Sequence, residues 1–367
     1  MPPPLESLPE ARAWYDTWLR QAALPLWSEA GVDPAKGCFY EALNRDGRPH
    51  PIRRRSRAQA RQIFVFASAA TAGYGEALVT VATRGFANMV REYRRPDGLF
   101  INSVSPDGQP LDQGVDVYEQ AFVLLAMAAL HQAAPETADF PSEAVRVLDA
   151  LEDRRAPGGG FRESGEHAYQ ANCHMHLFES ALAWEEAGVA GWAKLSDELA
   201  ELAMGRFISA QGVLREFFDA GWRPLTGGEG LIEPGHHFEW AWLLERWGLA
   251  RGDARARATA RALFENGLRG VDAARKVAVN ALWDDFSFRD ADARLWPQTE
   301  HVKAALRLGD EAMALSAAQG LAQYLDAPVT GAWRDKLRAD GSFVEEPSPA
   351  TSFYHLLGAV LELKRCA

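Results

Sequence analysis

The fold is decided by a recurring loop, which one copy spells as Gly98-Leu-Phe-Ile-Asn-Ser-Val-Ser-Pro-Asp-Gly108. A glycine that supplies a positive backbone dihedral is followed by alternating residues and an Asp-Gly turn, which predicts a short hairpin. Related loops begin at five other glycines: Gly37, Gly160, Gly212, Gly270 and Gly331. Because successive loops start 52 to 62 residues apart, the 367-residue chain reads as six repeats of about sixty residues.

Two amphipathic helices accompany each loop. In the first repeat an apolar stripe at three and four spacing runs from Leu8 to Ala22, and Ile63, Phe66 and Ala70 continue the rule after the loop. The later helix pairs are predicted at 75–94 and 113–133, 141–154 and 171–187, 190–208 and 235–250, 254–267 and 295–307, and 309–325 and 351–364.

Both terminal helices are apolar, which favours closure of the repeats into a ring over an open solenoid with polar ends. We therefore predict an all-α (α/α)6 barrel, a toroid of six helical hairpins with short β-hairpins at one mouth. It would form a single catalytic domain over residues 1–367.

The composition limits the class of partner. A net charge of -11 disfavours nucleic acid and a polybasic membrane anchor, and no apolar run is long enough to span a bilayer. Three cysteines without metal-binding spacing indicate neither a disulfide framework nor a zinc site. With no secretory signal pattern at the N-terminus, we expect a cytoplasmic protein, a monomer or homodimer, that acts on a small molecule.

Polar and aromatic residues share one phase of the repeat, near the start of the second helix of each pair. At that phase we expect them to converge on one mouth of the ring. The set comprises Arg61, Tyr118, Asn172, His176, His236, Glu239, Trp296, Glu300 and His355. Because His236 and Glu239 lie one helical turn apart, the carboxylate is predicted to hold the imidazole in one tautomer.

The chemistry of this set favours a small polyhydroxylated substrate. An indole can stack on the apolar face of a sugar, and amide and carboxylate groups can read its hydroxyls. Two imidazoles that titrate near neutral pH suggest proton transfer next to a carbonyl. Phosphate-binding and serine-hydrolase motifs are absent from the sequence, so dinucleotide chemistry and serine hydrolysis are not expected.

Several alternatives stay open at the level of single motifs. The basic run that ends at Arg61 could be solvated surface or could grip a phosphate on the substrate. The segment from Asn172 to His176 could be a metal cluster, although its spacing matches no standard site. Glu239 and Glu300 could be the carboxyl pair of a glycoside hydrolase. A sugar-binding module without catalysis is a further reading.

The chain resembles the N-acylglucosamine 2-epimerase superfamily, and within it the mannose isomerase and mannose-6-phosphate isomerase-like branch. The resemblance covers essentially the whole chain. It is carried by six motifs, namely Gln59-Ala-Arg61, Asp116-Val-Tyr-Glu-Gln-Ala-Phe122, Asn172-Cys-His-Met-His-Leu-Phe-Glu179, Pro234-Gly-His-His-Phe-Glu-Trp240, Leu295-Trp-Pro-Gln-Thr-Glu300 and Pro349-Ala-Thr-Ser-Phe-Tyr-His355.

That resemblance implies a metal-independent sugar isomerase without a cofactor. It would interconvert an aldose and a ketose of the mannose and fructose type through a cis-enediol, on a monosaccharide that is free or phosphorylated. An N-acylglucosamine or aldose 2-epimerase on the same fold is the alternative, followed by a glycoside hydrolase. His355 would be the C2 base, and His236 would serve ring opening and the proton on the opposite face of C2. Glu239 would orient His236, and Arg61 would stabilise the enediolate. Tyr118, Asn172, His176, Trp296 and Glu300 would bind substrate.

Overall fold

The computed structural model describes residues 4–226 and 230–365, which fall into two compact units. Unit 1 comprises Met1–Ala23, Ala200–Ser348 and His355–Ala367, and unit 2 comprises Leu24–Leu199 and Pro349–Tyr354. Each unit is therefore assembled from segments that are distant in the sequence. The single domain predicted over residues 1–367 stays a prediction.

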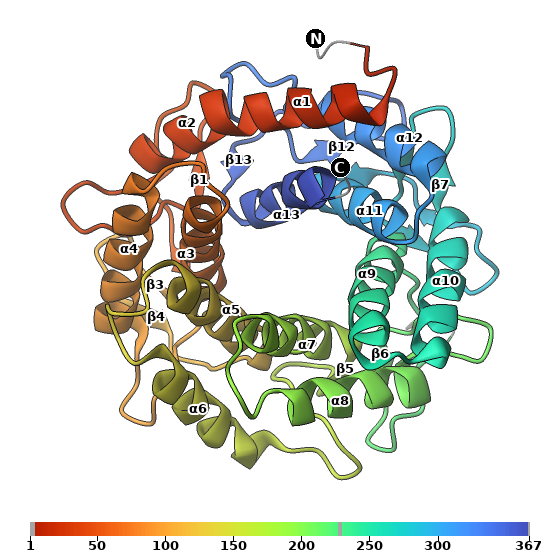
Figure 1. The fold of residues 1–367 in the computed structure, drawn as a ribbon, viewed down its shortest axis with the longest axis horizontal. Helices are drawn as coiled ribbons and strands as arrows, with labels where there is room; N and C mark the ends of the chain where they lie inside the picture. The colour runs from red at the N-terminus through yellow and green to blue at the C-terminus, as the bar shows by residue number, and fades with distance from the viewer. Residues whose placement is uncertain (1–3, 227–229, 366–367) are drawn as a thin grey trace. The chain divides into compact units, whose positions relative to one another are not determined.

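Unit 2 is built on consecutive helix pairs. Helix α3 packs against α4 and α5, and α5 packs in turn against α6 and α7, as Figure 1 shows from orange to green. The helices are α2 (Leu24–Glu29), α3 (Ser56–Thr71), α4 (Ala77–Tyr93), α5 (Val117–Ala133), α6 (Phe140–Leu151) and α7 (Ala171–Glu186), followed by the first residues of α8 (Ala193–Leu202). Its strands are β1 (Ala42–Leu43), β2 (Arg54–Arg55), β3 (Ser103–Val104), β4 (Pro110–Asp112) and β5 (Tyr169–Gln170).

Unit 1 repeats the arrangement. Helix α9 packs against α10 and α11, and α11 packs against α12, beside which α1 lies. Its helices are α1 (Leu8–Trp18), α9 (Pro234–Arg251), α10 (Ala254–Leu268), α11 (Leu295–Arg307), α12 (Glu311–Ala322) and, from His355 on, α13 (Thr351–Arg365). Its strands are β6 (Phe217–Phe218), β7 (Val271–Asp272), β8 (Val277–Ala278), β9 (Ala281–Leu282), β10 (Phe288–Asp290), β11 (Ala293–Arg294) and β12 (Lys336–Leu337), and β13 (Ser348–Pro349) begins at its edge.

The predicted helix pairs are all present, and their burial follows the pattern expected from the sequence. Every residue from Ala121 to Leu130 in α5 is buried, whereas α4 and α6 each keep one exposed face. The aspartates Asp139, Asp253 and Asp310 cap α6, α10 and α12 by accepting a hydrogen bond from a backbone N–H of the first turn. Gly252 adopts a left-handed conformation (φ 66°) and ends α9 just before α10 begins.

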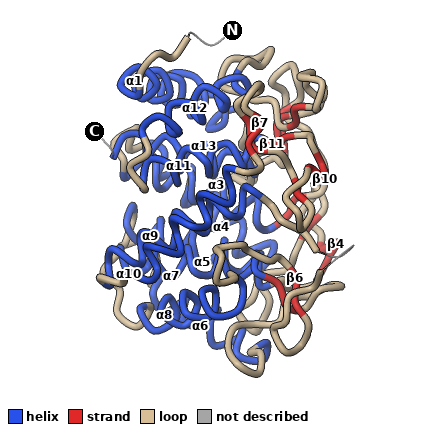
Figure 2. Tube along the Cα trace, turned by 90° about the vertical axis from the view of Figure 1, so that its right-hand side faces the viewer, coloured by secondary structure: helices blue, strands red, loops and turns tan. Residues whose placement is uncertain are grey.

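The loops form the short hairpins that the glycine repeat predicts. The strands are two or three residues long, and Figure 2 shows them in red within the loops. Strand β2 pairs antiparallel with β3, and β7 pairs antiparallel with β8. Isolated antiparallel bridges such as Arg94 to Phe100 recur in successive loops. In the described part of the chain, no helix combines the length and the apolar character needed to cross a membrane.

One hydrogen-bonding device recurs between loops and helices. The Gln59 side chain accepts from the Phe39 backbone N–H at 2.9 Å and donates to its carbonyl at 2.8 Å. Gln120 does the same for Phe100, and Gln298 does so for Ala278. In two repeats a histidine takes this place, because His174 accepts from the Phe161 N–H and His237 accepts from the Leu214 N–H. These histidines hold the loops to the helices.

Buried histidines make the stability sensitive to acid. His174, His237 and His301 are each at most 1% exposed, and burial lowers the pKa of the first two to about 4 and that of His301 to about 3. Within the described residues, neither ring nitrogen of His301 has a hydrogen-bond partner, and the ring stacks on Phe238. These groups are therefore neutral in the folded protein, while the unfolded chain takes up protons below about pH 6.5.

We expect His301→Leu to remove one part of this acid sensitivity. A group with a lowered folded-state pKa destabilises the fold as the pH falls below its unfolded value, by about 1.4 kcal/mol per pH unit. Relative to the parent, the variant should therefore gain ~2 kcal/mol more unfolding free energy at pH 5 than at pH 8. Urea unfolding at both pH values measures this difference. An equal change at the two values would show that His301 is not a neutral buried group.

Candidate active site

The start of helix α9 separates two adjacent histidines into different roles. His237 bonds the backbone on both sides, with Nε2 accepting from the Leu214 N–H at 3.0 Å and Nδ1 donating to the Glu233 carbonyl at 3.0 Å. His236 instead contacts the Trp296 indole, at 5.0 Å between ring centroids. Gly235 permits this approach, because a Cβ there would lie 2.5 Å from the indole. His237 is thus structural, and His236 is the chemical candidate.

A buried carboxylate holds His236. Its Nδ1 lies 3.0 Å from Oε2 of Glu216, which precedes strand β6, and 3.7 Å from Oε2 of Glu233. Burial alone would lower the pKa of His236, but the charges of Glu216 and Glu233 outweigh it and raise that pKa to about 10. Burial also raises the pKa of Glu216. The pair therefore keeps a proton at neutral pH and presents His236 as an acid.

A second imidazole and carboxylate lie between α11 and α13. Nδ1 of His355 is 2.8 Å from Oε1 of Glu300, and Oε2 of the same carboxylate is 2.5 Å from Nζ of Lys303. These three side chains are at most 5% exposed. With Nδ1–H donated to Glu300, Nε2 of a neutral His355 keeps its lone pair and can accept a proton.

Trp296 brings the two imidazoles to one place. Its ring lies 5.0 Å from that of His236 and 5.7 Å from that of His355, with interplanar angles of 39° and 37°. All three residues belong to unit 1 and come from α9, α11 and α13. Residues more than a hundred positions apart in sequence therefore border the same indole, as the shared phase of the repeat predicts for them.

Glu239 is the residue predicted to orient His236. The orienting role of Glu239 stays a prediction, since Glu239 acts on His236 through its charge. The carboxylate bonded to Nδ1 of His236 is that of Glu216. The reason is geometric, because the hairpin before β6 brings Glu216 to the imidazole. Glu239, 1% exposed, groups with Glu300 and His355, and ligand atoms of these three lie within 4.8 Å of one another.

A cluster of this composition could in principle hold a cation. Its donor chemistry fits proton transfer better, because the Lys303 ammonium is already bonded to Glu300 and supplies positive charge there. Nδ1 of His355 is also engaged by the same carboxylate. The prediction that the enzyme is metal-independent stays a prediction.

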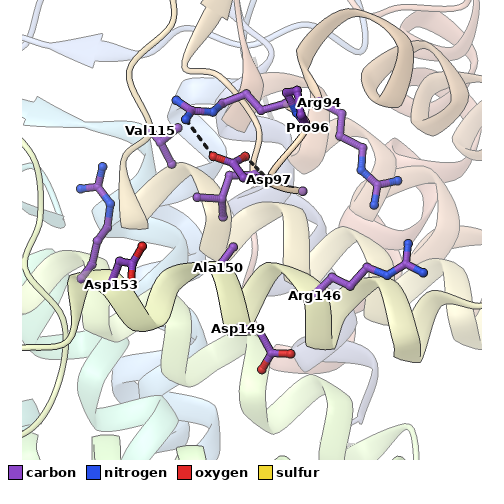
Figure 3. A pocket seen from close by; sticks show the side chains of 12 residues that line it. Arg94, Pro96, Asp97, Val115, Arg146, Asp149, Ala150 and Asp153 are labelled. Carbon is purple, nitrogen blue, oxygen red and sulfur yellow. Dashed lines mark hydrogen bonds and ion pairs between the residues drawn. The ribbon is translucent and has the colours of Figure 1, made fainter.

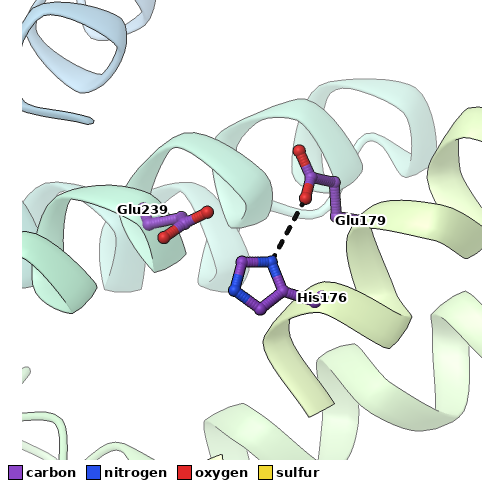
Figure 4. A group of neighbouring side chains, drawn as sticks. All are labelled: His176, Glu179 and Glu239. Atoms are coloured by element: carbon purple, nitrogen blue, oxygen red, sulfur yellow. Dashed lines mark hydrogen bonds and ion pairs between the residues drawn. The ribbon is translucent and has the colours of Figure 1, made fainter. Parts of the chain in front are cut away.

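Unit 2 holds the other predicted site residues in a second cluster. The Arg61 guanidinium donates to the Tyr118 hydroxyl at 2.9 Å and lies 4.1 Å from the centroid of the Phe122 ring. Nδ1 of His176 lies 3.4 Å from Glu179, the contact dashed in Figure 4, and its ring lies 5.1 Å from that of Tyr118. Arg61 is therefore buried among aromatic rings, at 6% exposure, and is not part of a solvated basic run.

The same cluster contains Tyr354 and Glu179, to which the sequence analysis assigned no role. The Tyr354 hydroxyl donates to Glu179, and the Arg61 guanidinium lies 5.1 Å from the Tyr354 ring. Tyr354 is the residue before His355 in α13. Asn172 stands in the first turn of α7 and is half-buried. The catalytic role of Arg61 and the substrate-binding roles of Tyr118, Asn172 and His176 stay predictions.

A large surface cavity lies elsewhere in unit 2. It has a volume of about 930 Å³ and is lined by the loop from Arg94 to Leu99 and by the exposed face of α6. Arg95 and Asp97 of this loop form an ion pair at 2.8 Å. Figure 3 shows Asp97 together with Arg146, Asp149 and Ala150 of α6. None of the predicted site residues lines this cavity, so its size does not identify the active site.

Glu216 and Lys303 are the main residues that the sequence analysis missed. A signal for Glu216 was present in the repeat. Glu41, Glu163 and Glu216 each stand two residues after the loop position that the recurring device holds, and all three are buried. Glu41 accepts from the backbone N–H of Arg55, the residue before α3, and Glu163 accepts from that of Val117, the first residue of α5, whereas Glu216 bonds an imidazole.

Known proteins similar to this chain include sugar isomerases and epimerases. A model of the N-acylglucosamine 2-epimerase (GlcNAc 2-epimerase) family matches residues 37–359. The chain is similar to the mannose-6-phosphate isomerase of Rhizobium meliloti (strain 1021), with 46% identity over 369 residues that cover 95% of each protein.

Two solved structures share the fold. Cellobiose 2-epimerase from Spirochaeta thermophila DSM 6192 superposes with a TM-score of 0.87, covering 100% of this chain and 98% of that one at 22% identity. A D-mannose isomerase also gives a TM-score of 0.87 and covers 100% of both chains at 20% identity. These similarities confirm the all-α (α/α)6-barrel class that the repeat predicts.

Proposed function

Because the chain belongs to the N-acylglucosamine 2-epimerase family, we propose that it interconverts an aldose and its ketose, of the mannose and fructose type, by proton transfer through a cis-enediol. Membership confirms the family resemblance and makes the protein a sugar isomerase or epimerase. The observation that carries the finer proposal is the pair of carboxylate-bound imidazoles on one indole, His236 with Glu216 and His355 with Glu300.

The two imidazoles are suited to opposite tasks. His236, held protonated beside Glu216 and Glu233, acts as the acid that opens the sugar ring and protonates the carbonyl oxygen O1. His355, with Nδ1–H directed at Glu300, acts as the base through Nε2. The Trp296 indole offers the apolar face against which a sugar ring can stack.

The proton balance closes over one turnover. Nε2 of His355 removes the proton from C2 while O1 takes a proton from His236, which gives the cis-enediol. The O2 hydroxyl then returns a proton to His236, and His355 delivers its proton to C1. The products are the ketose and an enzyme in its starting protonation state.

A 2-epimerase is the second candidate, and the same indole supports it. Since both imidazoles contact Trp296, a proton taken from one face of C2 by His355 could be replaced from the opposite face by His236. The product would then be the C2 epimer of the aldose, as in the cellobiose 2-epimerase that shares the fold.

Proton NMR in deuterated water separates these functions. The protein is incubated with mannose, glucose, fructose and their 6-phosphates, because the similar proteins include a mannose-6-phosphate isomerase and a D-mannose isomerase. A ketose from mannose or mannose 6-phosphate supports the isomerase, and an aldose of inverted configuration at C2, labelled there and formed without a ketose, supports the epimerase. The proposal fails if no sugar is converted and none exchanges its C2 proton.

A further inference from the structure

A buried lysine stands directly behind the proposed base. Lys303 lies one turn after Glu300 on α11 and is 1% exposed. Its Nζ is 2.5 Å from Oε2 of Glu300 and 3.8 Å from the centroid of the Trp242 ring of α9. The stem passes Gly358 of α13, where an added Cβ would lie 3.7 Å from Cδ of the lysine. Three helices thus enclose one ammonium.

Burying a charge is costly unless a partner compensates it, so this lysine needs a reason. Its partner Glu300 is fully buried and uses its other oxygen for Nδ1 of His355, at 2.8 Å. Lys303, Glu300 and His355 therefore form a continuous chain of hydrogen bonds that ends at the imidazole. An ammonium at one end favours the ionised carboxylate, which accepts Nδ1–H of a neutral imidazole.

The second imidazole lacks this arrangement. Among the described residues, no lysine or arginine forms an ion pair with Glu216, and Oε1 of Glu216 has no hydrogen-bond partner. A second carboxylate, that of Glu233, lies 3.7 Å from His236, and the Arg294 guanidinium that reaches Glu233 at 4.0 Å is 41% exposed. In both pairs a carboxylate binds Nδ1 of an imidazole, but within residues 4–226 and 230–365 only the carboxylate of Glu300 has a lysine beside it.

We propose that Lys303 is a positioning residue that makes His355 the base and leaves His236 as the acid, by neutralising Glu300 and not Glu216. The positive charge of Lys303 cancels the negative charge of Glu300. When His355 is neutral, the one net charge left in its cluster is therefore that of Glu239. His236 faces the carboxylates of Glu216 and Glu233, and the charge of Glu239 adds a smaller contribution, so His236 is stabilised as the imidazolium. The assignment of base and acid between two similar pairs follows from one buried lysine. This inference deepens the proposed function and rests on it.

The charged groups that face His355 within unit 1 define the test. They are Glu300 and Lys303 from α11 and Glu239 from α9, and His236 contacts the same indole. Replacing Lys303 by methionine keeps most of the side-chain volume and removes the charge. Glu300 or His355 then retains a proton to higher pH, and the base becomes active only when that proton leaves.

For Lys303→Met we expect kcat/KM at pH 7 to fall about tenfold, with the acidic limb of the pH profile moved up by about one unit. Activity at pH 9 should approach that of the parent, after subtraction of the enzyme-free rate. A lysine with only a packing role would lower activity by one factor at every pH, and that result would overturn the proposal. Lys336→Met, which removes an exposed lysine paired with Glu346, is the matched control and should leave the profile unchanged.

A double-mutant cycle covers the case in which Lys303→Met does not fold. Glu300→Gln removes the charge that the lysine compensates. In that background, Lys303→Met should fold, because position 300 no longer carries a charge that needs the ammonium, and it should leave the acidic limb where Glu300→Gln alone puts it. A further upward shift in the double variant would contradict a role through Glu300.

A readout without substrate separates this inference from the proposed reaction. Nitrogen-15 NMR of the His355 ring should report Nδ1–H in the neutral parent, and a titration midpoint that rises in Lys303→Met. If the parent turned over no sugar while this shift was seen, the proposed function would fail and the role of Lys303 would stand. An unchanged His355 titration in an active enzyme would reject the role of Lys303 alone.

Discussion

His355→Asn is expected to lower kcat/KM for the aldose by about 10²- to 10⁴-fold, the usual contribution of a positioned base. Asparagine can still offer an N–H to Glu300 near the position of Nδ1, so the buried carboxylate keeps a partner. What it removes is Nε2, the atom proposed to carry the C2 proton. Initial rates and the rate of deuterium entry at C2 should fall together, since both need this proton transfer.

The neighbourhood of His355 supplies a control on folding. The thermal midpoint of His355→Asn should stay close to that of the parent, because Glu300 remains paired with Lys303 at 2.5 Å. Near-normal C2 exchange in a folded variant would remove His355 from the mechanism. If His355→Asn loses both activity and the folded state, the same measurements are made on His355→Gln, whose amide lies nearer to the position of Nε2.

His236→Asn is expected to lower kcat by about 10²-fold or more on sugars that bind as closed rings, because the acid for ring opening is lost. Glyceraldehyde, which is too short to close a ring, should be affected less. The adjacent His237→Asn is the matched control, since His237 bonds backbone atoms on both sides. It should lower the unfolding free energy by about 1 to 3 kcal/mol and change kcat little.

The assignment of His236 as the acid predicts the direction in which the alkaline limb of the pH profile moves. Its acid form is present below a pKa of about 10, which burial would lower but the charges of Glu216 and Glu233 raise. Glu216→Gln removes one of these charges, so the alkaline limb of kcat should move to lower pH. A limb that moved to higher pH, or did not move, would mean that Glu216 does not hold the proton of His236.

Much of the fold could be predicted because the sequence repeats. The glycines that open the loops, such as Gly98 and Gly331, adopt positive backbone dihedrals, and the helices between them have the apolar stripes that their burial requires. The device that ties loop to helix was not predicted. Gln59 and His237 do the same work with different side chains, so the sequence shows no common motif for it.

The candidate site was predicted in part. A shared position in the repeat predicted that four residues converge, and they lie close together in unit 1: His236, Trp296, Glu300 and His355. The hydrogen-bond partner of His236 was not predicted, because spacing along a helix reports only neighbours on that helix, such as Glu239, which acts on His236 through its charge. Glu216 reaches the imidazole from a hairpin twenty residues earlier.

The sequence by itself determined the helical repeat, the residue types at its shared phase and the family, because periodicity and motifs are properties of local sequence. Only the tertiary structure decided which carboxylate faces which imidazole, and that a single buried ammonium lies behind one pair and not the other. The physical reason is that charge interactions depend on distances in space. Spacing on one helix places Lys303 beside Glu300, but it does not show that this carboxylate meets His355, 55 positions away, or that His236 meets Glu216, 20 positions away.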